Sequence, residues 1–170
     1  GLRMVKKTVN QDDPTVYHLF YADELGSPGA DITFFEYPGA RRGRAGAGMI
    51  DRITHRVAGD EALDFWADRL STEGVAVTRE PGFLQFADPE GMGHELVVST
   101  VNDPPLIAAH RQVPAEFALQ GFEAVHALVH EPSRSQELVA GVLGFAARDA
   151  HDYEASGEHR GGRIVFKPSN

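Results

Sequence analysis

The chain has 170 residues, 42% of them hydrophobic and 24% charged, and no cysteine. This indicates a globular protein with one or two small cores and excludes disulfide frameworks, CxxC redox centres and thiolate metal sites. The formal net charge of -9 argues against binding to nucleic acid. Because the sequence has neither a signal peptide nor an apolar run of about 18 residues that could span a membrane, we expect a cytoplasmic protein with no membrane partner.

The first part of the chain contains predicted strands but no predicted helix. Strands are expected at 3–9, 15–22 and 31–37. The glycine-rich segment 39–48 is predicted to be a flexible, solvated linker. Gly1 precedes a strand in the same way as Gly74 and Gly144 do at similar intervals along the chain. We therefore expect residues 1–45 to be the C-terminal part of a repeat whose first strand and helix lie before Gly1.

The second part, residues 46–102, contains one complete strand, helix and three-strand unit. Strands are predicted at 50–57, 75–79, 83–86 and 94–99. A helix is predicted over 60–73, and Gly74 is expected to end it. The apolar residues that define its buried face are Ala62, Leu63, Phe65, Trp66 and Leu70.

The third part, residues 120–170, is predicted to be an incomplete copy of the same unit, joined to the second by a linker over 103–119. Its first strand is expected at 122–129, followed by a helix that ends at Gly144. The apolar side of that helix is assigned to Leu138, Val139, Val142 and Leu143. Only two further strands are predicted, at 146–151 and 163–167, so that one strand of this copy is missing.

These units resemble the vicinal oxygen chelate superfamily, which includes glyoxalases, bleomycin resistance proteins and extradiol dioxygenases. One signal is the turn Asp88-Pro89-Glu90-Gly91, with Glu95 seven residues after Asp88. More specific is a set of segments at 5–14, 17–21, 26–29 and 33–35. These segments resemble the four-module dioxygenases that cleave hydroquinone-type phenols, and the resemblance covers the whole chain.

The resemblance implies an α+β fold of repeated βαβββ modules with curved mixed sheets, truncated at both ends. It also implies a fragment of a non-haem Fe(II)-dependent extradiol-type dioxygenase, with a small aromatic substrate and O2 as partners. The family's ligands lie in module one's first strand and in module four, so no cofactor and no activity are expected in the fragment. Unpaired modules would expose apolar sheet faces, which favours homo-oligomers.

Two other functions remain open for this sequence. One is a glyoxalase-like isomerase or lyase, which needs a metal but no O2. The other is a metal-free small-molecule binding module, as in bleomycin-resistance-like relatives. The sequence does not choose among the phenols, the metals or the oligomeric states.

In the family that the chain resembles, a module's first strand can give a metal-binding His and its last strand a Glu. The His position lies five residues before the Val that ends the first strand, which is Arg52 when counted from Val57 and Ala124 when counted from Val129. Neither residue is expected to bind a metal. Glu95 falls on the carboxylate position, but we expect it to pair with Arg52.

Asn10 and His18 are the candidate substrate-binding residues, because they lie on adjacent strands of the module that would face the metal. Each could hydrogen-bond a phenol oxygen or transfer a proton. Alternatively, Asn10 begins a polar turn and His18 fills one face of a strand. Phe20 and Phe34 are expected to supply an apolar wall for the substrate.

The remaining histidines are not assigned to a site. His55 is predicted to face the helix as a packed or edge residue, and His126 receives the same interpretation because it lies off the ligand position. His94 adjoins Glu95 and points the other way. Surface positions are expected for His110, His130, His151 and His159.

Overall fold

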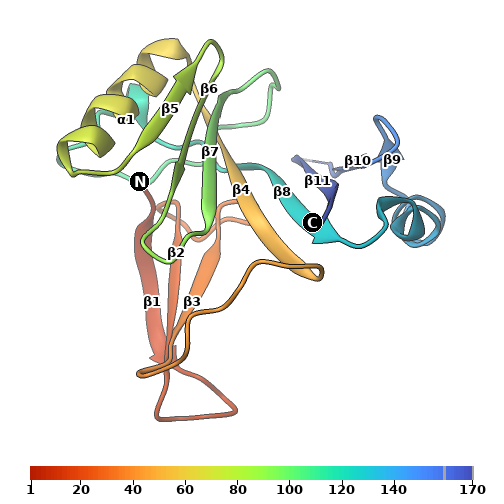
Figure 1. Ribbon diagram of the computed structural model, residues 1–170. Helices are drawn as coiled ribbons and strands as arrows, with labels where there is room; N and C mark the ends of the chain where they lie inside the picture. Colours follow the sequence, from red (N-terminus) through yellow and green to blue (C-terminus); the bar gives the residue numbers. More distant parts are fainter. Residues whose placement is uncertain (159, 170) are drawn as a thin grey trace.

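Two separate β-sheets dominate the computed structural model, which describes residues 1–158 and 160–169 (Figure 1). The smaller sheet is three-stranded and antiparallel, in the order β1-β2-β3. Its strands are β1 (Arg3–Val9), β2 (Tyr17–Ala22) and β3 (Ile32–Glu36). His159 lies outside the described residues.

The larger sheet has eight strands in the order β5-β6-β7-β4-β8-β11-β10-β9. Its first half contains β4 (Met49–Val57), β5 (Val77–Glu80), β6 (Phe83–Ala87) and β7 (Gly93–Val98). Its second half contains β8 (Phe122–Val129), β9 (Ala146–Ala147), β10 (Asp152–Ser156) and β11 (Gly161–Pro168).

The two halves of the larger sheet have the same internal order. In each half the first strand in the sequence runs parallel to the last, β4 beside β7 and β8 beside β11. The halves meet where β4 pairs with β8 in an antiparallel register. These mixed sheets with few helices confirm the predicted α+β class.

The principal core lies between the first half of the larger sheet and α1 (Asp60–Thr72). Leu63 and Trp66 of α1 pack against Leu84 of β6 and Leu96 of β7, and all four side chains are buried. Complete burial of each leucine contributes on the order of 1.5–3 kcal/mol. The Trp66 Nε1–H also donates a hydrogen bond of 2.7 Å to the Phe117 carbonyl in the 3-10 turn η1 (Ala115–Phe117).

The helix predicted in the third part of the chain is irregular. It consists of a 3-10 turn, η2 (Pro132–Ser135), and a π-helical segment, η3 (Glu137–Val142). Val139 is buried against Tyr153 and Phe166, as the apolar pattern predicts. The other predicted apolar positions, Leu138, Val142 and Leu143, are exposed. A π-helix has more residues per turn than an α-helix, so residues spaced for an α-helical face do not return to one side.

The prediction that one strand of the third copy is missing is wrong. The sequence pattern predicts one strand over residues 146–151, whereas the structure ends β9 at Ala147 and begins β10 at Asp152 after a turn. The polar sequence of β10 hides it, since only Asp152 and Tyr153 are buried there. Residues 120–170 therefore contain a first strand, a helical segment and three further strands, as residues 46–102 do.

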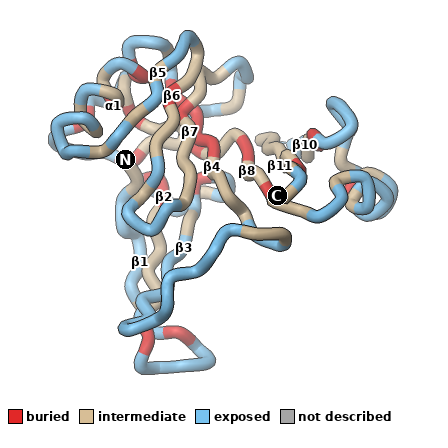
Figure 2. Tube along the Cα trace, in the orientation of Figure 1, coloured by how far each residue is buried: buried red, intermediate tan, exposed pale blue. Residues whose placement is uncertain are grey.

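The three-stranded sheet is much less covered than the larger one. Figure 2 shows β1 and β3 largely exposed, whereas β4 is buried over its second half. Val5, Val9, Tyr17, Phe34 and Phe35 of this sheet all have exposed side chains. Among the described residues, no helix has the length and apolar character needed to cross a membrane.

Candidate functional site

One face of the larger sheet, defined by Arg52, Thr54, Glu95 and His126 and called the polar face below, contains the candidate ligand positions. Thr54 on β4 lies beside Glu95 on β7, and Arg52 shares their face because it lies two residues before Thr54. The Arg52 Nη1 lies 3.2 Å from the Glu95 Oε2. The Glu95 carboxylate also accepts hydrogen bonds from the Thr54 hydroxyl at 3.1 Å and from the Gln85 amide at 2.5 Å. Protein groups therefore hold both oxygens of Glu95.

His126 belongs to the same cluster, although its place off the counted ligand position predicts only a packed or edge residue. In the antiparallel pairing of β4 with β8, His126 stands opposite Arg52, and its Nε2 lies 3.1 Å from the Thr54 Oγ1. Because the Thr54 hydroxyl donates its one proton to Glu95, the Nε2 of His126 must donate to Thr54. Burial, together with the charge of Lys167, lowers the pKa of His126, so its ring is neutral at pH 7.

The signal for His126 was present in the sequence. His126 is two residues from Ala124, the position counted back from Val129, and side chains two apart share one face of a strand. The relevant feature was therefore this face rather than one numbered position.

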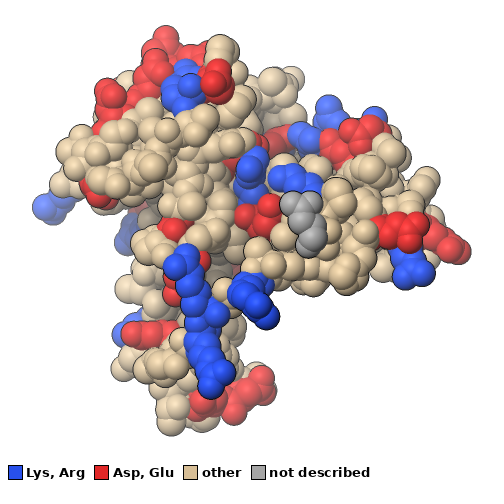
Figure 3. All heavy atoms as spheres, in the orientation of Figure 1, with Lys and Arg blue, Asp and Glu red and all other residues tan. Residues whose placement is uncertain are grey.

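A second charged cluster adjoins the polar face and surrounds the buried Arg56. The register between β4 and β8 shifts after Thr54, leaving Glu123 as an extra residue in β8. Arg56 donates to the Glu123 carboxylate at 2.7 Å and to the Asp103 carboxylate at 2.5 Å. Arg163 on β11 reaches the other oxygen of Glu123 at 3.4 Å. Figure 3 shows acidic and basic side chains side by side over this part of the sheet.

The residues of the polar face do not fit a divalent metal ion. Arg52 and Ala124 occupy the histidine positions that the resemblance assigns, and Glu95 is paired with Arg52. In the β4–β7 pairing, Glu95 lies beside Thr54. In the equivalent β8–β11 pairing, Val165 lies beside His126, so Val165 occupies the carboxylate position of the third module. In the part of the chain that the structure describes, no three His, Asp or Glu side chains gather as a metal-binding group.

The three-stranded sheet carries the other candidates on the face with His18, Phe20 and Phe35, called the aromatic face below. The ring of His18 packs between those of Phe20 and Phe35, with centroid distances of 4.0 and 4.1 Å. The His18 Nε2 is buried and has no hydrogen-bond partner among the described residues. His18 thus presents a polar atom within an aromatic cluster.

Asn10 has the turn geometry that was considered as its alternative role. Its Oδ1 accepts a hydrogen bond of 3.1 Å from the backbone N–H of Asp12, which closes an Asx turn. Its Nδ2 donates to the Tyr37 hydroxyl at 3.3 Å. The ring of Tyr37 in turn lies 6.0 Å from that of Phe35, centroid to centroid. Asn10 therefore connects the end of β1 to the aromatic face through Tyr37, a residue that the sequence analysis missed.

Phe20 and Phe34 do not form one wall, contrary to the prediction. The β2–β3 register pairs Phe20 with Thr33 and places Phe34 opposite Leu19. Since side chains alternate along a strand, Phe20 belongs to the aromatic face and Phe34 to the opposite face. There Phe34 meets Tyr21 edge to face, with centroids 5.6 Å apart.

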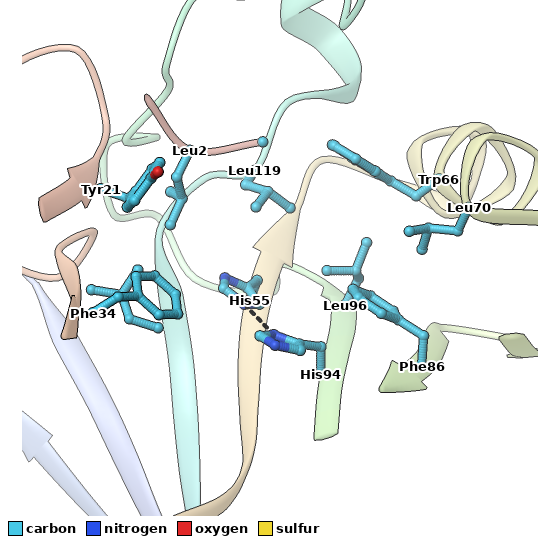
Figure 4. Close-up of a pocket in the computed structure, with 12 residues that line it drawn as sticks. Leu2, Tyr21, Phe34, His55, Trp66, Leu70, Phe86, His94, Leu96 and Leu119 are labelled. Atoms are coloured by element: carbon cyan, nitrogen blue, oxygen red, sulfur yellow. Dashed lines mark hydrogen bonds between the residues drawn. The ribbon is translucent and has the colours of Figure 1, made fainter. Parts of the chain in front are cut away.

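An apolar cavity of about 500 Å³ lies between the three-stranded sheet and the helix-covered face of the larger sheet (Figure 4). Tyr21 and Phe34 line one side and Trp66 of α1 another. His55 and His94 lie in its wall, with the His55 Nε2 3.3 Å from the His94 Nδ1. Burial lowers the pKa of His55 to about 3, so this histidine is uncharged at pH 7. The cavity lies on the opposite face of β4 and β7 from the candidate ligand positions.

No family model matches the chain. The chain is 35% identical over 165 residues to MhqA of Bacillus subtilis, provisionally named a ring-cleaving dioxygenase, with 92% of this chain and 52% of that protein covered. It is 33% identical over 146 residues to the chlorohydroquinone/hydroquinone 1,2-dioxygenase of Sphingobium indicum, covering 81% of this chain and 44% of that protein. The chain thus spans about half the length of these curated relatives.

Two solved structures share the arrangement of strands. A Bacillus subtilis protein, provisionally named a dioxygenase, superposes with a TM-score of 0.85 at 31% identity, over 98% of this chain and 56% of that one. A glyoxalase I variant from Zea mays superposes with a TM-score of 0.63 at 16% identity, over 99% of this chain and 60% of that one. The second likeness concerns the fold alone.

The chain therefore has the fold of the vicinal oxygen chelate superfamily, as the resemblance implies. Its homologues are proteins named as ring-cleaving dioxygenases.

Proposed function

We propose that this chain is the central part of a non-haem Fe(II)-dependent extradiol-type dioxygenase that cleaves hydroquinone or a related phenol. The observation that carries the proposal is the 33% identity, over 81% of the chain, to a protein named for hydroquinone cleavage. Because the chain spans about half of such relatives, the iron would be held by segments outside residues 1–170. Arg52, Ala124 and Val165 at the ligand positions support the placement of the iron outside residues 1–170.

The aromatic face is the part of this chain that we assign to the substrate. On β7, His94 and Leu96 line the apolar cavity and Glu95 between them faces the other way. On β3, Ile32 and Phe34 line the same cavity, so Thr33 between them faces away from it. Thr33 therefore occupies the position on β3 that Glu95 occupies on β7. The aromatic face of the first module thus corresponds to the polar face of the second module, which carries Glu95.

On this face, we assign His18 to the substrate directly and Asn10 through Tyr37. An aromatic substrate can stack on the exposed Phe35. A phenol hydroxyl can hydrogen-bond the Nε2 of His18 once the neighbouring rings of Phe20 and Phe35 move aside, because this nitrogen is buried in the chain alone. Asn10 holds the Tyr37 hydroxyl at 3.3 Å and leaves its proton free for a ligand oxygen. These groups bind and orient the ring, while the iron and O2 supply the oxidation.

The test is dioxygen uptake by the longer protein that contains this chain, loaded anaerobically with Fe(II). The proposal predicts consumption of one O2 for each hydroquinone lost, with a ring-opened product. Conversion of a substrate without O2 uptake would favour the isomerase alternative. Ligand binding without turnover, with less than about a tenth of an equivalent of iron bound, would favour the metal-free binding module.

His18→Phe tests the assignment of the aromatic face, because it keeps an aromatic ring between Phe20 and Phe35 and removes the ring nitrogens. We expect kcat/KM for hydroquinone to fall at least about tenfold, equivalent to one hydrogen bond of about 1.4 kcal/mol in the transition state. Tyr17→Phe, a neighbouring change on the opposite face of β2, should leave kcat/KM unchanged. Equal activity of both variants would contradict the assignment.

A further inference from the structure

The polar face has a fixed positive charge beside Glu95, and we propose that the Arg52 guanidinium replaces a divalent cation there. Replacing Arg52 by histidine would then produce a metal site from the new imidazole, Glu95 and His126. This inference concerns residues 1–170 alone and holds whether or not the longer protein cleaves a ring.

Three neighbouring strands bring the relevant groups together. Arg52 on β4 stands opposite His126 on β8, and its Nη1 lies 3.2 Å from the Glu95 Oε2 on β7. The Thr54 Oγ1 lies 3.1 Å from both the Glu95 Oε1 and the His126 Nε2. One hydroxyl group therefore holds the carboxylate and the imidazole near each other, with Arg52 beside both.

The chemistry of this donor set favours a metal once the guanidinium is absent. Two imidazoles and one carboxylate form a common set of ligands for Zn(II), Ni(II), Co(II) and Fe(II). A metal would bind the Nε2 of His126, which lies 3.1 Å from the Thr54 Oγ1, in the tautomer that carries the ring proton on Nδ1. The carboxylate of Glu95 is only 14% exposed and needs a compensating positive charge, which a divalent ion would supply.

Arg52 would also keep a metal away from these two potential ligands in the natural sequence. The positive charge of the Arg52 guanidinium would repel a cation entering beside Glu95. Lys167, whose ammonium group lies 4.0 Å from the Asp51 carboxylate, adds a second positive group near His126. The polar face is therefore neutralised by protein side chains, and removing Arg52 leaves Glu95 uncompensated.

The experiment measures Co(II) and Zn(II) binding to the 170-residue chain, by visible absorption for Co(II) and by titration calorimetry for Zn(II). We expect Arg52→His to bind about one equivalent at least tenfold more tightly than the unaltered chain, a change of about 1.4 kcal/mol or more. The bound Co(II) should show the visible bands of a protein-ligated ion. Adding Glu95→Gln or His126→Ala to Arg52→His should abolish the gain.

Arg52→Ala provides an independent decision if Arg52→His fails to fold. It removes the same charge and leaves Glu95 and His126 as two ligands, so Zn(II) should raise its urea midpoint but not that of the unaltered chain. Arg44→His is the control, because Arg44 is exposed and forms no ion pair with a carboxylate among the described residues. The proposal is overturned if folded Arg52 variants bind no more metal than the unaltered chain, or if the gain survives the loss of Glu95 and His126.

Discussion

Arg56→Ala should be among the most damaging single changes in this chain, because it removes the centre of a buried charge cluster. Arg56 is 3% exposed and donates to Glu123, to Asp103 and to the Gly161 carbonyl, the last at 3.2 Å. Among the described residues, its removal leaves Glu123, which is 16% exposed, with only the longer contact of 3.4 Å to Arg163. Breaking a buried ion pair costs about 3–5 kcal/mol, and the partial exposure of both carboxylates favours a loss near 3 kcal/mol.

Urea unfolding followed by tryptophan fluorescence measures this loss. Trp66 is the only tryptophan in the chain and lies on the buried face of α1, within the core, so its emission reports the folded state. Arg79→Ala is the control, since its partners Asp60 and Asp64 are more than half exposed and the pair should contribute little. The reasoning is refuted if Arg56→Ala loses no more stability than Arg79→Ala.

Three further changes test other parts of the structure. Burial lowers the pKa of His55 from about 6.5 in the unfolded chain to about 3. The free energy of unfolding should therefore be highest above pH 6.5 and fall as the pH drops toward 3, by up to about 1.4 kcal/mol per pH unit. Urea midpoints at pH 7 and 5 measure this fall, and His55→Leu should make the pH dependence of stability less steep. Leu96→Ala, at a side chain 2% exposed, should cost about 2–5 kcal/mol in the same unfolding assay. Gly121→Ala should lower the melting temperature more than Gly39→Ala, because both have positive φ but the Gly121 Cβ would also lie 3.0 Å from the Gly29 carbonyl oxygen, whereas the Gly39 Cβ would meet nothing within 4 Å.

The strands and the helix of residues 46–102 could be predicted because local pattern and tertiary packing agree there. The apolar spacing in 60–73 matches the face that α1 buries, and Gly74 follows the helix with a φ of +80°. In the third part they disagree. Leu138 and Val142 follow an α-helical spacing, yet the backbone forms a π-helical segment that leaves them exposed. Spacing alone does not set the number of residues per turn.

The site was harder to predict than the fold, because its geometry depends on pairing between distant strands. Counting back from Val57 located Arg52, and the expected pair with Glu95 is present because β4 and β7 lie side by side. The same count gave no sign that His126 lies opposite Arg52, since that contact depends on the register of β4 with β8.

The register shift beside Thr54 has a second effect that no sequence pattern predicts. An extra residue in one strand changes which side chains share a face beyond it. The shift leaves Glu123 unpaired in the ladder and within 2.7 Å of Arg56, so the polar face continues into the charged cluster. If this shift positions Glu123, deleting Glu123 should restore simple alternation and leave Arg56 buried without that partner. The deletion of Glu123 should then lower the free energy of unfolding by as much as Arg56→Ala does. A much smaller loss in the urea unfolding assay would show that the register shift does not organise the charge cluster around Arg56.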